Sequence, residues 1–267
     1  MIATIRTMGD LRRRTVMRGV ASSCVLAGAG SLAQEWVTSR HTDSPWSRVL
    51  VDPDALSAVR TSLPAVALTF DDGPDPRFTP HVLDVLARAG VTATFFLVGR
   101  NALQHPDLVR RIGAEGHEIA NHTQDHVWLD RLGAADVRAQ ISTGTVSLRS
   151  VGAPAPRVFR PPKGWTSREV AHAARGLGLR SVFWTDCLEA KLHRGVRAGA
   201  DDVAQGARPG SVLLLHDGGH LDGPNPQALD RGGTLEALPH LLTGLRRRGL
   251  TASSVRRLLP VPSQYQG

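Results

Sequence analysis

Two adjacent carboxylates, Asp71 and Asp72, close an apolar run in "LTFDDGP", residues 68–74. Two like charges a few ångströms apart repel each other, so a cation is needed if both stay ionised. Successive strand residues point to opposite faces, but a turn at the strand end can bring both carboxylates into one site. Asp and Gly also favour turns, so the pair alone fits a turn motif equally well.

A histidine pair stands in "NHTQDH", where His122 and His126 are four residues apart. If this stretch is a helical turn, both imidazoles can reach one ion. Two imidazoles and one carboxylate form a usual open zinc site with a position left for water. The chain has 11 His, so the pair alone is only moderately specific. Cys24 and Cys187 are the only cysteines, which excludes a cysteine-based zinc site.

Strand and helix patterns alternate over about 190 residues from residue 64, which predicts a parallel α/β fold. Thr79 and Pro80 predict the start of the first helix, with Thr79 as its N-cap. The expected strands are 64–70, 91–99, 117–123, 157–162, 180–186 and 210–219. The expected helices are 79–90, 106–116, 134–152, 167–178, 200–207 and 234–249.

Polar residues follow several of these strands at the point where each ends. They are Asp71-Asp72, Asn121-His122, Arg160 and His216-Asp217. In a barrel of parallel strands, the face at the carboxyl ends of the strands carries the active site. We therefore expect these separate strand ends to converge on one cleft.

The first 33 residues have the pattern of an export leader. "LRRRTVMRG" is basic, a mildly apolar run of small residues follows, and Ser31-Leu32-Ala33 resembles a cleavage site. A basic tail without structure is the alternative, and the paired arginines leave twin-arginine export open. We expect residues 34–63 to be a linker or wrapping arm and residues 64–260 to be the catalytic domain. The predicted location is extracellular or associated with the cell wall.

The net charge of +8 belongs largely to the leader. Removing its five Arg and one Asp from the 32 basic and 24 acidic residues leaves 27 and 23, a net charge of +4. This mild surplus does not indicate nucleic-acid binding. No run of about 18 apolar residues is present, so no transmembrane helix is expected. The sequence indicates no particular oligomeric state.

Four segments in this order, "TFDDGP", "HTQDH", "RPPKG" and "LLLHD", resemble the polysaccharide deacetylases of carbohydrate esterase family 4, which share the NodB homology domain. The resemblance covers about residues 64–260. It implies a single catalytic domain built as a distorted barrel of parallel strands with surrounding helices. It also implies a metal-dependent hydrolase that removes N-acetyl groups from an acetylated glycan, peptidoglycan or chitin-like. An O-acetyl esterase acting on xylan-type polysaccharide and a catalytically weak glycan-binding member are the alternatives.

The resemblance also implies a role for individual residues. Asp71 is the implied general base and His216 the implied general acid. The implied metal ligands are Asp72, His122 and His126, with zinc as the expected ion and cobalt as an alternative. A bound zinc ion polarises the amide carbonyl and lowers the pKa of water to about 7. Arg160 is implied to hold the base, Thr123 to support the histidine loop and Leu214 to contact the acetyl methyl. The backbone N–H of Lys163 is the expected oxyanion donor. Trp165, directly after "RPPKG", is the candidate for stacking on a sugar ring, with packing as the alternative.

Two positions depart from the family pattern. Lys163 stands where many members carry an aromatic residue, which either favours peptidoglycan over chitin or has no consequence. In the fourth motif, Ala190 stands where an Asp that orients the general acid is expected. Asp186 or Glu189 could orient His216 instead, and the sequence does not choose between them. This weak motif is the support for the catalytically weak alternative.

Overall fold

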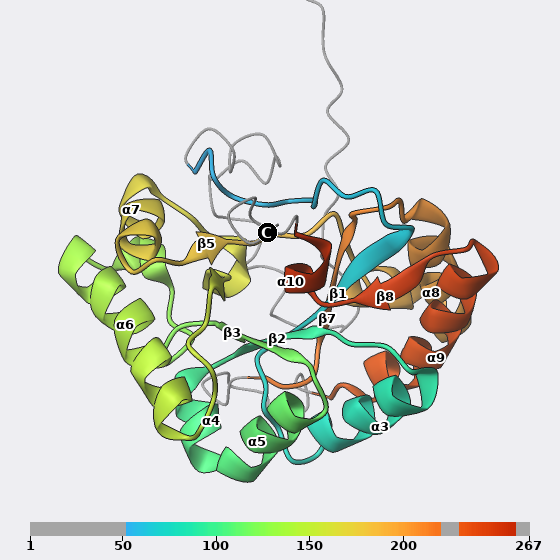
Figure 1. Ribbon diagram of the computed structural model, residues 1–267, viewed down its shortest axis with the longest axis horizontal. Coiled ribbons are helices and arrows are strands. Elements are labelled where there is room, and N and C mark those ends of the chain that lie inside the picture. The colour runs from blue at the N-terminus through green and yellow to red at the C-terminus, as the bar shows by residue number, and fades with distance from the viewer. Residues whose placement is uncertain (1–51, 220–229, 260–267) are drawn as a thin grey trace, which may run out of the picture.

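The computed structural model describes residues 52–219 and 230–259 (Figure 1). The predicted export leader and the first part of the predicted arm lie outside these residues, and the predicted domain bounds stay predictions. Among the described residues, no helix has the length and apolar character needed to cross a bilayer.

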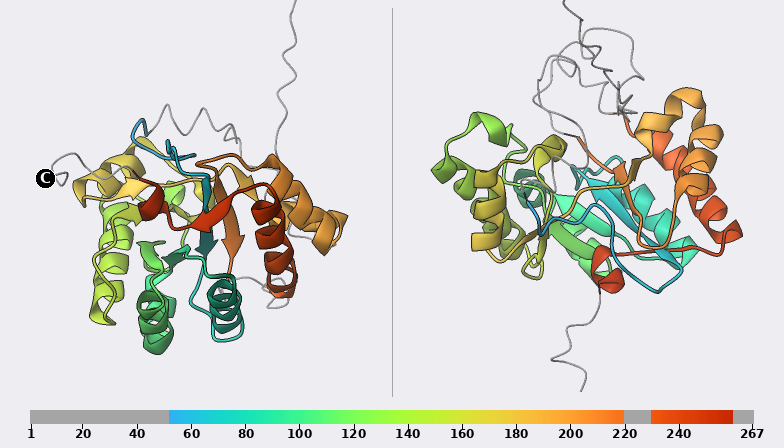
Figure 2. Two further views of the ribbon diagram at one scale, coloured as in Figure 1. Left: turned by 45° about the vertical axis from the view of Figure 1, so that its right-hand side comes forward. Right: turned by 90° about the horizontal axis from the view of Figure 1, so that it is seen from above.

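The strands form one parallel sheet in the order β5-β4-β3-β2-β1-β7-β6, and β8 pairs with the start of β1. Their bounds are β1 (Ala65–Asp71), β2 (Thr94–Leu97), β3 (Glu118–Asn121), β4 (Val158–Phe159), β5 (Arg180–Ser181), β6 (Asp186–Cys187), β7 (Val212–His216) and β8 (Thr251–Ser253). The sheet curls into a half-barrel with helices outside it (Figures 1 and 2). The predicted distorted barrel of parallel strands is therefore confirmed.

The run 180–186, predicted as one strand, is split in the structure. It contributes the two edge strands β5 and β6, and residues 182–185 cross the opening between them. The backbone N–H of Val182 still bonds to Phe159 of β4, whereas that of Thr185 bonds to Val212 of β7. Because these seven residues change partners from one end of the sheet to the other, they cannot form one continuous strand.

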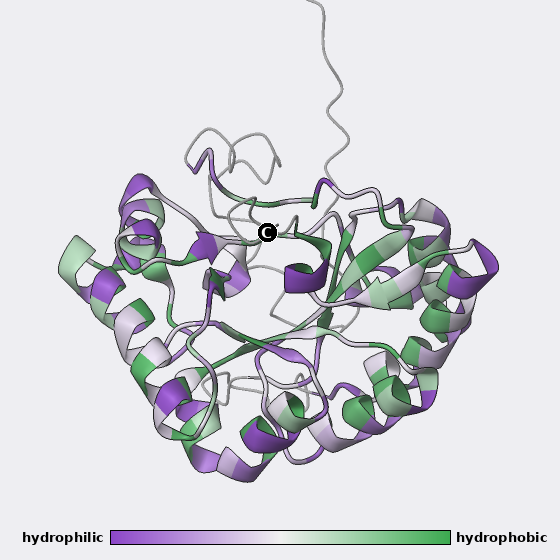
Figure 3. Ribbon diagram, in the orientation of Figure 1, coloured by the Kyte–Doolittle hydropathy of each residue, from purple (hydrophilic) through white to green (hydrophobic). Residues whose placement is uncertain are grey.

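Most of the helices lie outside the curved sheet, whereas α10 (Val255–Leu258) packs against the inner cluster at its open end (Figure 1). They are α3 (Thr79–Ala89), α4 (Gly99–Gln104), α5 (Pro106–Ala114), α6 (Ala134–Ser150), α7 (Arg168–Gly176), α8 (Val196–Gly206), α9 (Gly232–Arg247) and α10 (Val255–Leu258). The short helices α4 and α10 are not among the predicted elements, since periodicity is a weak signal over so few residues. Figure 3 shows hydrophobic and hydrophilic residues alternating along the longer helices, as expected for helices with one buried face.

The N-cap of α3 differs from the sequence prediction. Phe78 occupies the cap position without a side-chain cap hydrogen bond, and Thr79 is the first helical residue. The Thr79 hydroxyl instead lies 2.6 Å from Oδ2 of Asp217, to which it donates. Thr79 therefore ties the start of α3 to the end of β7 rather than capping its own helix.

Side-chain alternation in β1 separates two apolar clusters. Val66, Leu68 and Phe70 belong to the cluster between the sheet and the helices. Ala65 and Ala67 belong to a second cluster inside the curve of the sheet. Because β-strand residues alternate between faces, Thr69 and Asp71 continue the inner row, and Asp71 ends it at the carboxyl edge.

The described end of the predicted arm lies against the sheet. Leu56 forms a parallel bridge with Val182, and Ala58 forms an antiparallel bridge with Ser211. Leu56 and Val59 are buried in the inner cluster together with Val255 of α10. Figures 1 and 2 show this blue segment and α10 (red) at the same end of the molecule. The segment thus covers the inner cluster where the half-barrel is open.

Candidate active site

A buried ion pair joins the end of β1 to the end of β4. Nη1 of Arg160 lies 2.6 Å from Oδ1 of Asp71, and the Arg160 side chain is fully buried. The same nitrogen donates to the Thr69 hydroxyl at 3.0 Å. Nε and Nη2 donate to the carbonyl oxygens of Val182 and Phe183, both at 2.9 Å. The guanidinium therefore has a partner on each nitrogen and holds the Asp71 carboxylate against the crossing segment.

Asp72 comes to the same edge of the sheet through an unusual backbone conformation. Its φ angle is 75°, in the left-handed region that residues with a side chain rarely adopt. Oδ1 of Asp72 lies 3.4 Å from Nε2 of His122 and 3.1 Å from Nε2 of His126. After the turn at the strand end, Asp71 pairs with an arginine and Asp72 with two imidazoles, and Nε2 of His122 also lies 3.7 Å from Oδ2 of Asp71.

Asp72, His122 and His126 form a group that could hold a metal ion. One ligand atom from each lies within 4.8 Å of the other two, and all three residues are buried. Burial would raise the pKa of Asp72, but His126 and His122 outweigh it and lower the pKa well below its usual value. The donor set of two imidazoles and one carboxylate matches that of an open zinc site.

The histidine segment is a loop and not the helical turn considered from its spacing. Thr123 and His126 have positive φ angles of 70° and 57°, which fold the loop back on itself. The backbone N–H of His126 donates to the Thr123 hydroxyl at 3.1 Å, and that of Thr123 donates to Oδ1 of Asn121 at 2.7 Å. The two imidazole rings end with their centroids 4.9 Å apart.

The orientation of His122 follows from its second ring nitrogen. Nδ1 lies 2.7 Å from the carbonyl oxygen of Arg160 and is buried there, so it carries the proton and donates it. Nε2 is the nitrogen left for a metal ion, and it lies 3.4 Å from Oδ1 of Asp72. A hydrogen bond of this kind is the usual second partner of a metal-binding histidine. Arg160 therefore contributes to both halves of the site, through its side chain to Asp71 and through its backbone to His122.

His216 ends β7 and pairs in register with Asp71 of β1. Its Nδ1 lies 3.2 Å from Oε2 of Glu189, and its backbone N–H donates to Oε1 of Glu189 at 2.9 Å. Thr234 of α9 donates its hydroxyl to the same Oε1 at 2.7 Å. Of the two candidates left open by the sequence, the structure places Glu189 next to the imidazole. Asp186 instead bonds to the backbone N–H of Cys187 and lies 3.9 Å from Lys191.

The electrostatics of this pair favour the charged form of His216. Burial would lower the pKa of His216, but the Glu189 carboxylate more than compensates, and the pKa is raised. Burial would raise the pKa of Glu189, yet the imidazolium lowers it to about 2. The pair therefore favours the protonated imidazole at the edge of the sheet, which is the state that a general acid needs.

The remaining predicted residues occupy the rim and wall of this edge. Leu214 is buried in β7, two residues before His216 and therefore on the same face of the strand. Lys163 has a φ angle of 59° in η2 (Pro162–Gly164), and its Nζ lies 4.5 Å from the centre of the Trp128 ring. The Trp165 and Trp128 rings are 6.0 Å apart between centroids. Trp128, which the sequence analysis did not single out, thus pairs with the predicted stacking residue.

Residues with positive φ and a side chain are confined to this region within the part of the chain that the structure describes. They are Asp72, Thr123, His126 and Lys163. Each such conformation costs of order 1–3 kcal/mol and persists only where the surroundings impose it. The strain therefore coincides with the polar residues at the strand ends, which is typical of a functional site.

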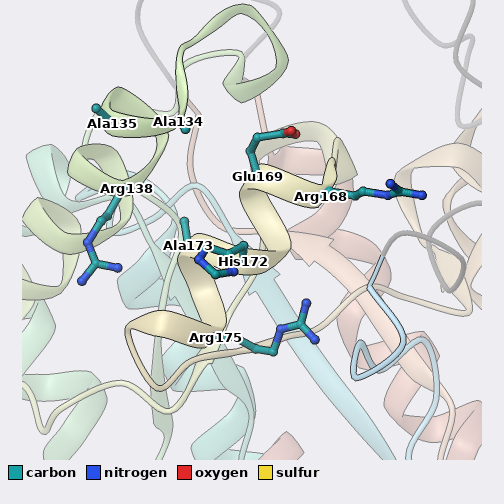
Figure 4. Close-up of a pocket in the computed structure, with 8 residues that line it drawn as sticks. All are labelled: Ala134, Ala135, Arg138, Arg168, Glu169, His172, Ala173 and Arg175. Atoms are coloured by element: carbon teal, nitrogen blue, oxygen red, sulfur yellow. The ribbon is translucent and has the colours of Figure 1, made fainter.

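A separate pocket of about 730 Å³ lies between α6 and α7 (Figure 4). Its lining residues are Ala134, Ala135, Arg138, Arg168, Glu169, His172, Ala173 and Arg175. None of them is a predicted site residue, and Figure 4 shows the arginine side chains pointing in different directions. The chemistry therefore belongs to the strand ends and not to this pocket.

Sequence reasoning missed two residues that contact this site. Thr234 bonds to Glu189, and Arg231 places Nη2 3.4 Å from Oδ2 of Asp72. Both stand in "RGGT" at the start of α9, a stretch that resembles an ordinary helix start in sequence. Their signal is positional, because α9 begins beside the carboxyl end of β7.

The comparisons with known proteins agree with this architecture. A family profile described as polysaccharide deacetylase matches residues 58–182. A chitooligosaccharide deacetylase of Sinorhizobium fredii (strain NBRC 101917 / NGR234) is 42% identical over 197 residues, which cover 73% of this chain and 92% of that protein.

Solved structures give the same result. The Bc1960 peptidoglycan N-acetylglucosamine deacetylase is 31% identical, with a TM-score of 0.69 and coverage of 81% of this chain and 97% of that one. A family 4 carbohydrate esterase from Streptomyces lividans, solved in complex with acetate, is 30% identical with a TM-score of 0.62 and coverage of 73% and 93%.

A curved parallel sheet with acidic, imidazole and guanidinium groups gathered at the carboxyl ends of its strands defines a barrel hydrolase. The chain belongs to the polysaccharide deacetylase family.

Proposed function

We propose that this protein is a metal-dependent deacetylase that removes N-acetyl groups from an amino-sugar oligomer or polymer. The observation that carries the proposal is the position of the three grouped residues Asp72, His122 and His126. They lie beside the ion pair of Asp71 and Arg160, and Asp71 in turn pairs in register with His216 on the neighbouring strand. The S. fredii relative acts on chitooligosaccharides and the Bc1960 enzyme on peptidoglycan by their names, which supports an acetylated glycan as the substrate.

The residues present fit a divalent ion. His122 directs Nε2 into the group because its Nδ1 is bonded to a carbonyl, and Oδ1 of Asp72 faces both imidazoles. Zinc suits this donor set best, and cobalt is the alternative, since ligand type alone does not separate the two. When bound, such an ion supplies Lewis acidity that polarises a carbonyl group and acidifies water.

The chain's own residues divide the proton transfers between two sides of the site. Asp71, held by Arg160, accepts the proton of the attacking water. His216, kept protonated by Glu189, donates a proton to the departing nitrogen, which an amine requires because it is a poor leaving group. Leu214 bounds the space beside His216 for an acetyl methyl, and the backbone N–H of Lys163 serves as an oxyanion donor. Trp165, paired with Trp128, offers an aromatic face to a sugar ring.

The two alternative functions are an O-acetyl esterase and a catalytically weak glycan-binding protein, and the acetate-release screen described below distinguishes them. An O-acetyl esterase would use the same site with less need of His216, because an alkoxide leaves more easily than an amine. A catalytically weak member would bind glycan without turnover. The contact between Glu189 and His216 favours an active enzyme, because it provides the imidazole with a carboxylate despite the unusual fourth motif.

The proposed location is outside the cytoplasm, either extracellular or at the cell wall. Its support is the sequence pattern of residues 1–33 and the nature of the proposed substrate. Fractionating cells that produce the full chain tests it, and retention of the uncleaved protein in the cytoplasm would contradict it.

The deciding experiment is an acetate-release screen over chitooligosaccharides, peptidoglycan and acetylated xylan, with and without a chelator. We expect release from an N-acetylated substrate, loss of release in chelator and recovery on adding zinc. Zinc at 100 times its dissociation constant should stabilise the parent protein by about 2.7 kcal/mol and so raise its melting temperature. His126→Ala should abolish both this rise and the release of acetate.

The matched control is His172→Ala, which removes an exposed histidine of α7 and should change neither result. Release from acetylated xylan alone would favour the esterase. Zinc binding without release from any of the three substrates would favour the glycan-binding alternative.

A further inference from the structure

Arg231 contacts the proposed metal group through the carboxylate oxygen of Asp72 that does not face the histidines. It stands at the N-terminus of α9, with 17% of its side chain exposed. Its Nε donates to the carbonyl oxygen of Gly218 at 2.8 Å, and its Nη2 lies 3.4 Å from Oδ2 of Asp72. One guanidinium therefore bridges the segment after β7 and the carboxylate after β1.

The two oxygens of Asp72 have different partners. Oδ1 faces Nε2 of His122 and Nε2 of His126, which is where an ion would be held. Oδ2 faces Arg231. The carboxylate of Asp72 can rotate about its side-chain bonds unless its second oxygen is also bound. Arg231 is the side chain that binds this second oxygen.

We propose that Arg231 is a positioning residue that fixes the carboxylate of Asp72 for metal binding, an inference that rests on the proposed metal-dependent function. Partners of metal-binding side chains typically change metal affinity by about 10–100-fold when they are mutated. Arg231 also lies close enough to act electrostatically on Glu189 and His216. The residue thus links the metal side of the site to the general-acid side.

Charge and geometry act in opposite directions at this position. The positive guanidinium repels a bound cation, so removing its charge would tighten metal binding. The planar fork holds Asp72, so losing it would weaken metal binding. Arg231→Lys separates the two effects, because it keeps the charge but replaces the rigid planar fork by one ammonium on a flexible stem.

The test is a calorimetric titration of the metal-free full chain with zinc, for the parent protein and the Arg231→Lys variant. We expect the dissociation constant to rise about tenfold in the lysine variant. Acetate release by that variant should return to the parent level at saturating zinc. Arg175→Lys, which changes an exposed arginine paired with Asp54, is the matched control and should bind zinc as the parent does.

The melting temperature of each metal-free variant shows whether it is folded. Arg231→Gln is the second variant, and its loss of affinity should be smaller because the repulsion is removed together with the fork. Unchanged affinity in both variants would overturn the role of Arg231 while leaving the metal site intact. A parent protein that binds no zinc would instead overturn the proposed function on which this inference rests.

Discussion

Asp71 and Asp72 are neighbours in the chain whose carboxylates have different main partners, although Nε2 of His122 lies within 3.7 Å of both. Asp71 ends the inner row of β1 and meets Arg160 at 2.6 Å. Asp72 turns through a positive φ angle and meets His126 at 3.1 Å. Because each carboxylate has its own cationic or imidazole partner, the repulsion between them is offset and each is available for a different task.

At this scale, Asp71→Asn separates base catalysis from metal binding. The amide cannot accept the water proton, so we expect kcat to fall about 10²–10⁴-fold, the usual contribution of a general base. Asp71 is not one of the three grouped ligands, so zinc affinity should be unchanged. Parallel measurement of acetate release and zinc titration checks this, and a loss of zinc binding in the variant would assign Asp71 to the metal instead.

The pH dependence of the reaction should depend on Glu189. The general acid is active while protonated, so activity is lost as the pH rises through the pKa of His216. Glu189 raises that pKa, whereas burial lowers it. In Glu189→Gln the raising partner is gone, so the alkaline limb of the kcat/KM profile should move to lower pH.

Asp186→Asn is the control for this shift. Asp186 was the other candidate partner in the sequence, but its carboxylate bonds to the backbone of Cys187. The alkaline limb of this variant should stay where the parent has it. If Asp186→Asn shifted the alkaline limb and Glu189→Gln did not, the assignment of Glu189 as the partner of His216 would be wrong.

Between elements, α6 supports the histidine loop through close backbone contact. Asn121 donates through Nδ2 to the carbonyl oxygen of Ile141 and to the Thr145 hydroxyl, both at 2.8 Å. A Cβ atom on Gly144 would lie 2.8 Å from the backbone carbon of Thr123. The loop can approach the helix this closely because residue 144 has no side chain.

Gly144→Ala should therefore displace the loop. Such overpacking costs about 1–3 kcal/mol of unfolding free energy, which exceeds the gain of about 0.5–1 kcal/mol that Ala brings to a helix. Zinc affinity should fall as well, because His122 and His126 flank Thr123 in the loop. Urea unfolding and zinc titration measure the two effects.

Gly113→Ala in α5 is the matched control. The nearest atom to its added Cβ is Cδ1 of Ile119 at 3.8 Å, an ordinary contact distance. This variant should gain about 0.5–1 kcal/mol and bind zinc like the parent. Equal behaviour of the two glycine variants would show that the loop does not depend on the close approach to α6.

Across the whole molecule, Arg160 braces the opening of the half-barrel. It connects β4 to Asp71 of β1 and to the carbonyl oxygens of Val182 and Phe183 in the crossing segment. Its guanidinium carbon also lies 4.1 Å from the centre of the Phe96 ring. A single buried cation therefore joins strands that are not adjacent in the sheet.

Arg160→Met should lower the unfolding free energy by about 3–5 kcal/mol, because it leaves the buried Asp71 carboxylate without its cation. The double variant with Asp71→Asn should be more stable than the sum of the single losses predicts, since no charge is then left unpaired. Urea unfolding of the four proteins gives this coupling. Additive losses would show that Arg160 acts on stability through its other contacts alone.

The sequence by itself identified the residue types at the strand ends and the alternation that positions them. Strand and helix periodicity is local, so a parallel α/β fold could be predicted from short windows, and the family resemblance then implied the distorted barrel. Asp71, Asp72, His122, Arg160 and His216 could be expected in one cleft because they lie at or near the ends of predicted parallel strands, which share one edge of the sheet. Their roles, and that of His126 as a metal ligand, were implied by the resemblance to the family.

Only the tertiary structure decided which side chains serve these residues. Glu189 meets His216 across 27 positions of sequence, and Arg231 meets Asp72 across 159. No local pattern distinguishes Glu189 from Asp186, because their difference arises from the path of the crossing segment and the position of α9. The left-handed backbone at Asp72 and His126 was equally hidden, since such conformations are imposed by the surrounding contacts and not by the preference of the residue itself.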